Sequence, residues 1–582
     1  MKRTGPSRHA RRRAGLIASV AVVVAPAALL VSSSSASADG NAGLPAVLQP
    51  NKLLVSMSTW QQNAAISAGT TELPPGCTTA PNAPNPCATA VSGGDYPYTF
   101  NNDQVDGSFG ITQPIILEQI NPSSQKSMGS LVVPNSTTTS GDQLVTSFSS
   151  KSELALNQSS DGSDVTFMGY VAPVAAIDVS NSNTPGAIDT TNSGTTTPYY
   201  RAVAAVNRAA QCQVTETNAY SGNNGRAAFL NSSNDSIYTV GNAGNGANPE
   251  PQGVVAGAGS QILAPSTVVE SAQSPGSPTP LGNFNVTQLG LAADKSAKDD
   301  NFRGLTVSNN VIYMTKGSGG NGVDTVYFLD TTGSACPNGV GNPSPDATLP
   351  SASEWMSPMY STSDPALGLT TKNPGLSPTN MCVLDGFPTT SAKDASDSSL
   401  YPFGIWFANP DTLYVADEGS GDATFSSSTG MYTNAAASTT AGLQKWVFNG
   451  TQWNLAYTLQ SGLNLGVPYQ VARGPQGQTY PTGENSYVNS TGQTVDLGNW
   501  APANDGLRNL TGQVNANGTV TLWSTTSTVS GSGDQGADPN SLVTLTDNLA
   551  ATTPPTVESF STVVGPTWGQ VVRGVSFTPG TK

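Results

Sequence analysis

The 582-residue chain contains a single histidine, His9, and this residue lies close to the N-terminus. Without histidine, the rest of the chain has no Ser-His-Asp or Cys-His catalytic pair, no histidine general base and no imidazole metal ligand. Charged residues make up only 10% of the chain, and no later stretch is apolar and long enough to cross a bilayer. Any chemistry must therefore depend on carboxylates, Tyr, Lys, Arg or a hard cation.

The N-terminus has the layout of a cleaved signal peptide. Residues 2–13 include six basic side chains and no acid, residues 14–31 are apolar, and Ala36-Ser37-Ala38 resembles a cleavage site. We therefore expect residues 1–38 to be removed and residues 39–582 to be secreted to the extracellular space. An uncleaved anchor is the alternative, and the Sec and Tat export routes both remain open.

The chain is acidic, with 23 basic and 38 acidic side chains and a net charge of −15. Residues 1–38 hold six of the basic side chains and none of the acidic ones, so the remainder would carry a net charge of −21. A chain this acidic repels phosphate backbones. We therefore expect no nucleic-acid partner.

Five cysteines in an exported chain suggest two disulfides and one remaining thiol. Cys77 and Cys87 flank a short loop with three prolines and are expected to pair. Cys336 and Cys382 are the next couple, which leaves Cys212 as a small buried thiol. A reactive Cys212 is the alternative, but only Arg208 lies near it in the sequence to lower its pKa.

Short runs of Val, Ile, Leu, Tyr and Phe recur between turn clusters, and helical periodicity is scarce, which indicates many short strands. The strands repeat as a unit of four. The clearest copy comprises residues 402–419, 442–448 and 453–457. Weaker copies pair Phe302–Val307 with Val311–Met314 and Thr325–Leu329, Gly225–Phe229 with Ile237–Val240, Leu507–Leu510 with Val520–Trp523, and Glu153–Leu156 with Val165–Met168.

The last copy, residues 572–577, ends after its first strand, and a matching second strand occurs at residues 51–57. A ring that closes by sharing one blade between its two ends requires this arrangement, because no sheet edge then stays open. We therefore predict an all-β fold, a six- or seven-bladed β-propeller closed by strands from both termini. Residues 39–582 would form one such domain, a monomer with long loops on one face.

The strand Leu413-Tyr-Val-Ala-Asp417, with its following glycine, resembles the strand of NHL and YVTN-type repeat propellers. The chain as a whole resembles the broad lactonase-like propeller group. The resemblance covers the repeat skeleton and implies the propeller fold. No site motif of those families is present, so no functional residue is carried over.

The first strand of each blade is innermost in a propeller, and four copies place arginine at its start: Arg226, Arg303, Arg508 and Arg573. Guanidinium groups match carboxylates as bidentate forks, so these arginines are candidates for binding a carboxylate-bearing ligand. The alternative is that each arginine pairs with an acid of a neighbouring loop and fastens one blade to the next. Asp299, Asp300 and Asp505 are the acids that could serve.

Three further residues are predicted to contact a ligand at the funnel. Asp505 lies close to Arg508 in the sequence, and Trp60 and Trp500 lie in loops beside segments that would line the funnel. Tryptophans of a propeller more often pack between strands, which is the alternative for both rings.

Acidic residues gather at two places. Asp417, Glu418 and Asp422 follow the best-defined second strand, and neighbouring carboxylates can divide acid and base roles in glycoside cleavage. The alternative is a capping turn in which Asp417 accepts backbone N–H groups. Asp534 and Asp538 lie in a glycine-rich loop that could hold Ca2+, although the spacing fits no EF-hand.

Three functions remain open at this stage. The first is non-catalytic binding of extracellular glycan or cell-surface material through a polar funnel. The second is cleavage of glycan by a hydrolase or lyase that uses carboxylate and Tyr chemistry, and the third is a structural or adhesive surface protein. The first is favoured because every catalytic candidate has a structural alternative, and a propeller fold supports all three.

Overall fold

The computed structural model describes most of residues 47–581, and all of these belong to the compact unit Asn41–Lys582. The predicted signal peptide, residues 1–38, and the predicted arginine partners Asp299 and Asp300 lie outside the described residues. The other segments left undescribed between 47 and 581 are 78–86, 103–109, 134–142, 152, 186–196, 218, 243–258, 266–281, 284–300, 319–322, 333, 337–338, 351–359, 362–374, 377–380, 391–399 and 489–492.

The described chain is built from β-strands, which confirms the predicted all-β class. Its one α-helix, α1 (Thr433–Ala437), is a single turn, and short 3-10 turns occur at Tyr98–Asn102, Val179–Asn181 and Gln535–Ala537. No helix in the described part has the length and apolar character needed to cross a membrane.

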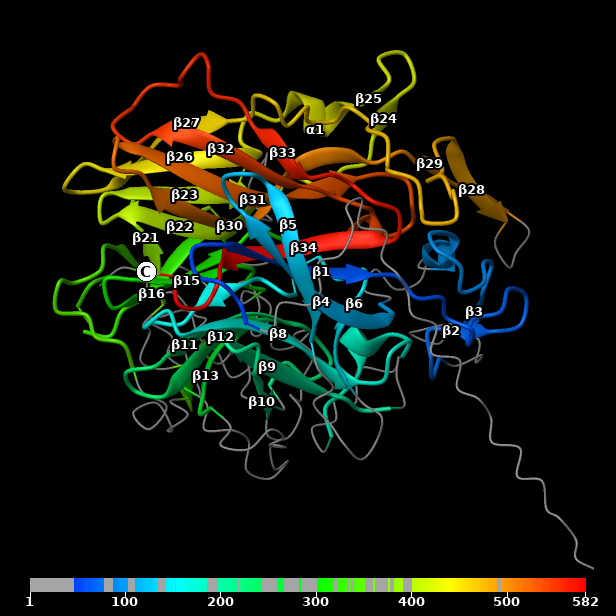
Figure 1. Ribbon diagram of the computed structural model, residues 1–582, viewed down its shortest axis with the longest axis horizontal. Coiled ribbons are helices and arrows are strands. Elements are labelled where there is room, and N and C mark those ends of the chain that lie inside the picture. The colour runs from blue at the N-terminus through cyan, green and yellow to red at the C-terminus, as the bar shows by residue number, and fades with distance from the viewer. Residues whose placement is uncertain are drawn as a thin grey trace, which may run out of the picture. The chain divides into compact units, whose positions relative to one another are not determined.

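Four separate antiparallel sheets follow one another along the chain (Figure 1). Three of them have four strands, and the fourth has five, because the short β18 pairs in parallel with β21. The strands are β11 (Gly225–Asn231), β12 (Ser236–Gly241), β13 (Ser260–Leu263) and β14 (Gly282–Asn283); β15 (Leu305–Ser308), β16 (Val311–Lys316), β17 (Thr325–Leu329), β18 (Val340–Gly341) and β21 (Met381–Leu384); β22 (Pro402–Asn409), β23 (Thr412–Asp417), β26 (Gly442–Phe448) and β27 (Trp453–Leu459); and β30 (Ala503–Val514), β31 (Thr519–Val529), β32 (Leu542–Asn548) and β33 (Ser561–Val564).

A larger sheet of nine strands holds both ends of the described chain. Its main path runs β10-β9-β8-β6-β4-β1-β34, with β5 beside β4 and β7 beside β8. The strands are β1 (Leu53–Thr59), β4 (Thr112–Asn121), β5 (Lys126–Val132), β6 (Gln143–Ser147), β7 (Asn157–Gln158), β8 (Asp164–Ala172), β9 (Tyr200–Asn207), β10 (Cys212–Thr217) and β34 (Gln570–Phe577). Small two-stranded sheets join β2 (Glu72–Leu73) to β3 (Ala88–Thr89), β19 (Tyr360–Ser361) to β20 (Gly375–Leu376), β24 (Phe425–Ser426) to β25 (Met431–Tyr432) and β28 (Glu484–Val488) to β29 (Thr494–Asn499).

The first strands of the four separate sheets, together with β7 and β34 of the nine-stranded sheet, contact one another in a series that closes on itself. β7 contacts β11, β11 contacts β15, β15 contacts β22, β22 contacts β30, β30 contacts β34, and β34 returns to β7. A closed series of inner strands with the later strands of each sheet outside it is a propeller-like arrangement.

The predicted closure by both ends of the chain is confirmed. β1 pairs antiparallel with β34, Leu53 opposite Phe577 and Val55 opposite Val575, with an irregularity at Ser56 and Met57. In Figure 1 the blue β1 lies next to the red β34. On its other side β1 pairs with β4, so neither edge of β1 is left open.

The inner strands of neighbouring sheets approach backbone to backbone at two glycines. A Cβ on Gly304 would lie 1.9 Å from the carbonyl oxygen of Phe403, and a Cβ on Gly404 would lie 2.2 Å from that of Arg508. Any larger residue would force these strands apart. Glycine is therefore required here because there is no room for a side chain, not because of an unusual backbone conformation.

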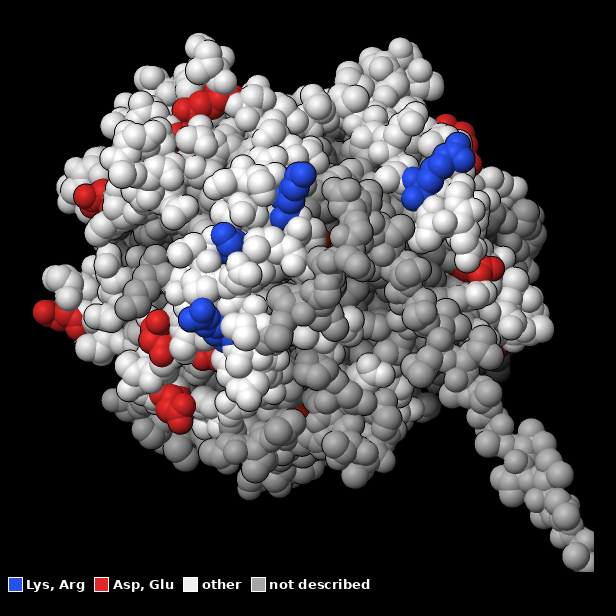
Figure 2. Space-filling model, in the orientation of Figure 1, with Lys and Arg blue, Asp and Glu red and all other residues white. Residues whose placement is uncertain are grey.

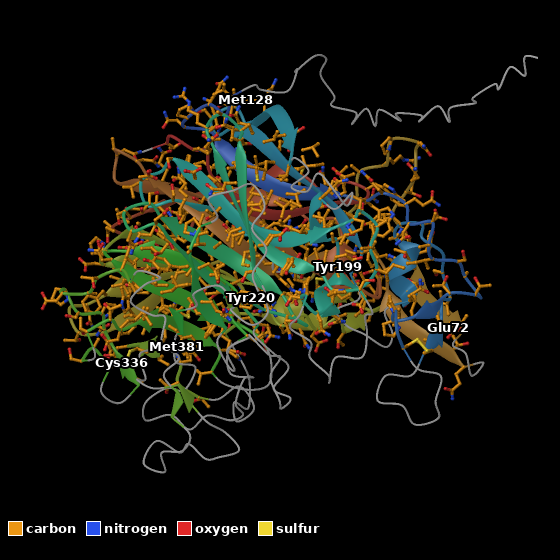
Figure 3. The ribbon with its side chains drawn as sticks, turned by 90° about the horizontal axis from the view of Figure 1, so that it is seen from below. Glu72, Met128, Tyr199, Tyr220, Cys336 and Met381 are labelled. Carbon is orange, nitrogen blue, oxygen red and sulfur yellow. A yellow bond between two sulfur atoms is a disulfide. The ribbon has the colours of Figure 1, made fainter. Side chains whose placement is uncertain are left out.

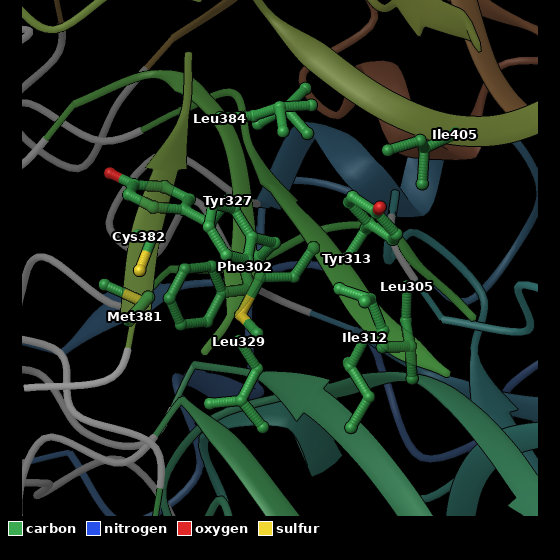
Figure 4. Close-up of a cluster of buried hydrophobic side chains, with 14 of the residues drawn as sticks. Phe302, Leu305, Ile312, Tyr313, Tyr327, Leu329, Met381, Cys382, Leu384 and Ile405 are labelled. Carbon is green, nitrogen blue, oxygen red and sulfur yellow. The ribbon is translucent and has the colours of Figure 1, made fainter. Parts of the chain in front are cut away.

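Between the sheets lie apolar clusters, the largest of which joins β12, β16, β17, β21 and β23. Figure 4 shows part of it, with Phe302, Ile312, Tyr327 and Leu384 packed together. On the face seen in Figure 2, charged side chains are scattered singly over a mostly uncharged surface. Other charged side chains form ion pairs inside the protein.

One such pair joins the sheet of β26 to that of β32. Lys445 Nζ lies 2.9 Å from Asp547 Oδ2, and neither side chain is exposed. The hydroxyls of Tyr414 and Tyr457 also donate to this carboxylate, and Lys445 donates to the carbonyl oxygen of Asn548 at 2.7 Å. Both charges are fully satisfied, so the pair fastens two sheets together.

One predicted strand is wrong. Glu153–Leu156 is not a strand; β8 pairs instead with β6 and with the two-residue β7. The chain between β6 and β7 leaves the sheet, and it carries Lys151 and Glu153. Glu153 accepts hydrogen bonds from the N–H of Ser147 and from Thr146 Oγ1, Tyr170 Oη and Asn224 Nδ2, so its carboxylate is bound both by nearby residues and by side chains distant in the sequence.

Both predicted disulfides are present, Cys77–Cys87 and Cys336–Cys382, and Cys212 is free. The sulfur–sulfur bond of the first is visible near Glu72 in Figure 3. Cys212 is half-buried, and burial raises its pKa to about 12. The thiol therefore stays protonated at neutral pH, which argues against the reactive alternative.

Truncating β1 in its core should destabilise the whole unit. Leu54 is 0% exposed, and we expect Leu54→Ala to lower the free energy of unfolding by about 3 kcal/mol, because the lost side chain leaves a cavity at the seam. Leu455→Ala is the control: Leu455 is 42% exposed, and the change should cost less than about 0.5 kcal/mol. Denaturant titration measures both, and equal losses would contradict a role of β1 in the core.

The two disulfides should contribute unequally. Their sequence separations are 10 residues for Cys77–Cys87 and 46 for Cys336–Cys382. Loop-closure entropy then gives about 3 kcal/mol and about 4 kcal/mol respectively. We expect the double substitution Cys336→Ala/Cys382→Ala to lower the denaturation midpoint more than Cys77→Ala/Cys87→Ala. The reverse order would show that chain entropy does not govern these bridges.

Candidate functional site

A polar cavity of about 310 Å3 lies where loops from several sheets meet the inner strands. It includes residues that follow β16 and β23, the start of β30, the end of β31 and the segment between β6 and β7. Its lining is rich in charges and hydroxyls: Lys151, Arg303, Gly317, Ser318, Asp324, Tyr401, Glu418, Gly419, Ser420, Gly421, Asp505, Arg508, Thr528 and Gln535.

Glu418 lies between two of the predicted arginines. Arg508 Nε is 3.1 Å from Glu418 Oε2, and Arg303 Nε is 4.0 Å from Glu418 Oε1. Burial alone would raise the pKa of Glu418, but Arg303, Arg508 and Lys151 outweigh burial and lower it. Glu418 is therefore a carboxylate at neutral pH, and it holds both arginines at the cavity wall.

Arg508 keeps donors available to the cavity. Its Nε is used by Glu418, whereas its η nitrogens make no hydrogen bond to any residue that the structure describes. The side chain is only 5% exposed and lines the cavity. Arg303, by contrast, also donates to the hydroxyl of Ser318.

Asp505 supplies a free acceptor at the same place. Its Oδ2 accepts the N–H of Gly421 at 2.6 Å, while the buried Oδ1 has no hydrogen-bond partner among the described residues. Burial raises the pKa of Asp505 to about 7, and the charge of Glu418 adds to this, against the opposing effect of Lys151 and Arg508. Asp505 therefore changes protonation state near neutral pH.

Lys151 was missed by the sequence analysis. Its Nζ lies 3.3 Å from Gln535 Oε1, and burial lowers its pKa, with Arg508 acting in the same direction. The available signal was its position two residues before Glu153, which occupies the place of the arginine in that copy of the repeat. We expected a strand there, and an irregular segment with an inward side chain was not predictable from the repeat.

Of the three acids proposed for catalysis, only Glu418 lines the cavity. Asp417 accepts the N–H groups of Tyr401 at 2.8 Å and Gly419 at 3.0 Å, which is the capping geometry given above as the alternative. Burial raises the pKa of Asp417 to about 7. Asp422 is half-buried outside the cavity and accepts from Thr424. The carboxylates that share the cavity wall are instead Glu418, Asp505 and Asp324.

The four arginines lie in one buried group, but two of them do not line the cavity. Arg226 donates to Asn301 Oδ1 and to the carbonyl of Phe302, and Arg573 donates to the carbonyls of Phe148 and Gly536. Burial lowers the pKa of both, and a neighbouring arginine lowers it further, Arg303 for Arg226 and Arg508 for Arg573. Arg226 and Arg573 form no ion pair with any acid that the structure describes, and the predicted partners Asp299 and Asp300 lie outside the described residues.

Trp60 and Trp500 pack in an aromatic cluster rather than against the cavity. The Trp60 ring lies 5.2 Å from those of Phe100 and Phe148, and the Trp500 ring lies 5.4 Å from that of Tyr98. Trp500 is 5% exposed, so little of its face is available to a sugar. Both positions match the packing alternative given above.

The loop proposed for calcium uses its oxygens within the protein. Asp534 caps the turn Gln535–Ala537 by accepting the N–H of Gly536, and Asp538 accepts from Tyr480 and Ser530, each at 2.6 Å. In the described part of the chain, the one group of three potential metal ligands is Asp330 with the disulfide-bonded Cys336 and Cys382. The calcium site at Asp534 and Asp538 stays a prediction.

No known protein family matches the sequence, and neither does any curated protein. Among solved structures, the chain is similar to a protein from Lactobacillus plantarum, with 8% identity over 81% of this chain and 98% of that one and a TM-score of 0.31. It is also similar to a polysaccharide lyase of family PL25, an ulvan lyase (10% identity, 89% and 96% covered, TM-score 0.26), and to an apocarotenoid oxygenase mutant from Synechocystis (8%, 91% and 93%, TM-score 0.27). Likenesses this weak carry no argument about function, and no match supports the NHL or YVTN repeat itself.

The raised pKa of Asp505 makes stability depend on pH. A carboxyl whose pKa is higher in the folded than in the unfolded chain stabilises the fold at low pH, and this contribution is lost as pH rises through about 7. We expect the apparent unfolding temperature to be higher at pH 5 than at pH 8, with Asp417 and Asp538 adding to the trend.

Asp505→Asn should reduce this pH dependence by an amount on the order of 2 kcal/mol, because the amide does not titrate. Asp422→Asn is the control. Hydrogen bonds from Thr424 lower the pKa of Asp422, so this carboxyl stays ionised between pH 5 and pH 8 and does not contribute to the difference. Thermal unfolding at pH 5 and pH 8 measures the difference. An unchanged slope in Asp505→Asn would contradict the raised pKa.

Proposed function

We propose that the protein is an exported, non-catalytic β-propeller that binds extracellular glycan or cell-surface material in this cavity. The proposal rests on one observation: at the wall of one cavity, the buried Asp505 Oδ1 and the η nitrogens of Arg508 have no hydrogen-bond partner among the described residues. Unpartnered buried groups are costly, and a ligand that completes their hydrogen bonds removes the cost.

The chemistry of the lining fits a polyhydroxylated ligand. Sugar hydroxyls both donate and accept, and the wall offers carboxylate acceptors, cationic donors and the hydroxyls of Ser318, Ser420 and Thr528. Aliphatic side chains, which are common in sites for apolar ligands, are absent from this lining, and Tyr401 is its one aromatic residue.

We infer six blades for the propeller. Within the nine-stranded sheet, β34-β1-β4-β5 and β7-β8-β9-β10 each repeat the four-strand order of the separate sheets, which adds two blades to four. Export is supported by the signal-like N-terminus and is compatible with the two disulfides. We expect a monomer.

Glycan cleavage is the second candidate, and one observation favours it. Glu418 has a lowered pKa and Asp505 a pKa raised to about 7, and both line the same cavity. Carboxyls whose environments separate their pKa values are suited to divide base and acid roles. Cleavage would leave new reducing ends, or unsaturated ends in the case of a lyase.

A glycan array probed with the labelled protein tests the proposal. We expect a defined set of glycans to be bound, and Asp505→Asn to reduce binding at least tenfold, because an acceptor in the cavity is lost. Asp422→Asn, which alters an acid that does not line the cavity, should bind as the unmodified protein does.

The bound glycans are then incubated with the protein and assayed for reducing ends and for absorbance of unsaturated products. Binding without product supports the proposed function, whereas product supports the hydrolase or lyase. Failure to bind any glycan would favour a structural surface protein.

A further inference from the structure

The free groups of the cavity define what a ligand must carry. Arg508 presents η nitrogens that have no acceptor among the described residues, and a guanidinium fork is best matched by a planar, charged oxygen pair such as a carboxylate. Lys151, whose Nζ has Gln535 as its neighbour at 3.3 Å, adds a second donor on the same wall.

Asp505 imposes the opposite requirement. Oδ1 of this side chain accepts no hydrogen bond from the described chain, and an ionised carboxylate can only accept. A hydroxyl of the ligand suits both protonation states of Asp505, because it can donate to the carboxylate and accept from the protonated acid. A ligand that satisfies Arg508 and Asp505 together carries a carboxylate and a hydroxyl on one small frame.

The charge of the wall agrees with a single negative charge on the ligand. Lys316 lies 2.7 Å from Asp324, so this acid is neutralised within the protein. The remaining charged residues of the lining are three cations, Lys151, Arg303 and Arg508, and two acids, Glu418 and Asp505. One positive charge is left over when Asp505 is ionised and two when it is protonated, in a chain whose net charge is −15. This positive charge is confined to the cavity wall, so the cavity favours a negatively charged ligand.

Size limits the ligand to a small unit. A cavity of about 310 Å3 lies at the lower limit of small-molecule sites, which span roughly 300–1,000 Å3. One sugar ring with its substituents fits this scale, whereas a long oligosaccharide does not.

We propose that the cavity binds one acidic sugar residue of the uronate type, with its carboxylate on the Arg508 guanidinium and a ring hydroxyl donated to Asp505. This assignment rests on the proposed glycan-binding function and names the sugar class of that site. Arg303 and Glu418 position Arg508 through their mutual ion pairs.

Isothermal titration calorimetry with matched sugars tests the assignment on the full chain. D-galacturonate and D-galactose differ at C6, as do D-glucuronate and D-glucose, and acetate supplies the carboxylate without the hydroxyls. We expect at least one uronate to bind ten- to a hundredfold more tightly than its neutral partner and than acetate, because each lacks one of the two required groups.

Variants separate the two contacts. Arg508→Lys keeps a positive charge beside Glu418 but removes the fork, and it should weaken uronate binding at least tenfold while leaving neutral sugars unaffected. Asp505→Asn should weaken both sugar types. The N–H of Gly421 will hold the amide oxygen, so the –NH2 group faces the ligand and the acceptor becomes a donor. Arg226→Lys is the control, since Arg226 is buried at the same place in another sheet and does not line the cavity.

Thermal unfolding of each variant identifies loss of fold. Equal affinity for uronates and neutral sugars, acetate binding as tightly as a uronate, or an Arg226→Lys loss as large as that of Arg508→Lys would each overturn the acidic-sugar assignment. Neutral glycans bound on the array with no uronate binding would overturn it while leaving glycan binding intact. Absence of binding to any glycan would overturn both.

Discussion

The pairing of β1 with β34 brings Leu53 opposite Phe577, so the two ends of the described chain share one sheet. Loop-closure entropy grows only slowly with chain length, and a seam of buried backbone hydrogen bonds and apolar side chains can offset it. With the seam formed, the inner strands make an unbroken series, and each is covered on both sides by a neighbour. The convergence of side chains from β30, from the residues beside β15 and from those after β23 on one cavity depends on that series.

Two groups of buried charged side chains have different roles in this fold. At Lys445 and Asp547 every donor and acceptor has a partner, including two tyrosine hydroxyls and a backbone carbonyl, so the charges are consumed within the fold. At Arg508 and Asp505 one side of each group is bound by the protein and the other side faces a cavity. Burial is similar at both places. The difference is that Arg508 and Asp505 keep unused hydrogen-bonding atoms, which a binding site needs, whereas the Lys445–Asp547 pair only joins two sheets.

The sequence was sufficient to predict the features that depend on local pattern and on pairing. The incomplete copies at residues 51–57 and 572–577 predicted the seam, and cysteine spacing predicted both disulfides. The arginine positions predicted four cations lining the funnel, but not that only Arg303 and Arg508 would line the cavity. That division depends on the length and direction of side chains from different sheets. The irregular segment around Lys151 and Glu153 has no periodic signal, because its conformation is fixed by tertiary contacts such as that of Glu153 with Asn224.

The close approach at Gly304 and Gly404 bears on how the blades have diverged from one another. In one copy the glycine follows Arg303 and in the next it follows Phe403, so the small residue is shared while the side chain before it differs. The close approach of the backbones thus requires glycine at this position but leaves the residue before it free to differ. A duplicated blade can exchange a cation for an aromatic ring without disturbing the contact with the adjacent strand. An asymmetric pocket can arise in this way on a scaffold of equivalent units, one blade at a time.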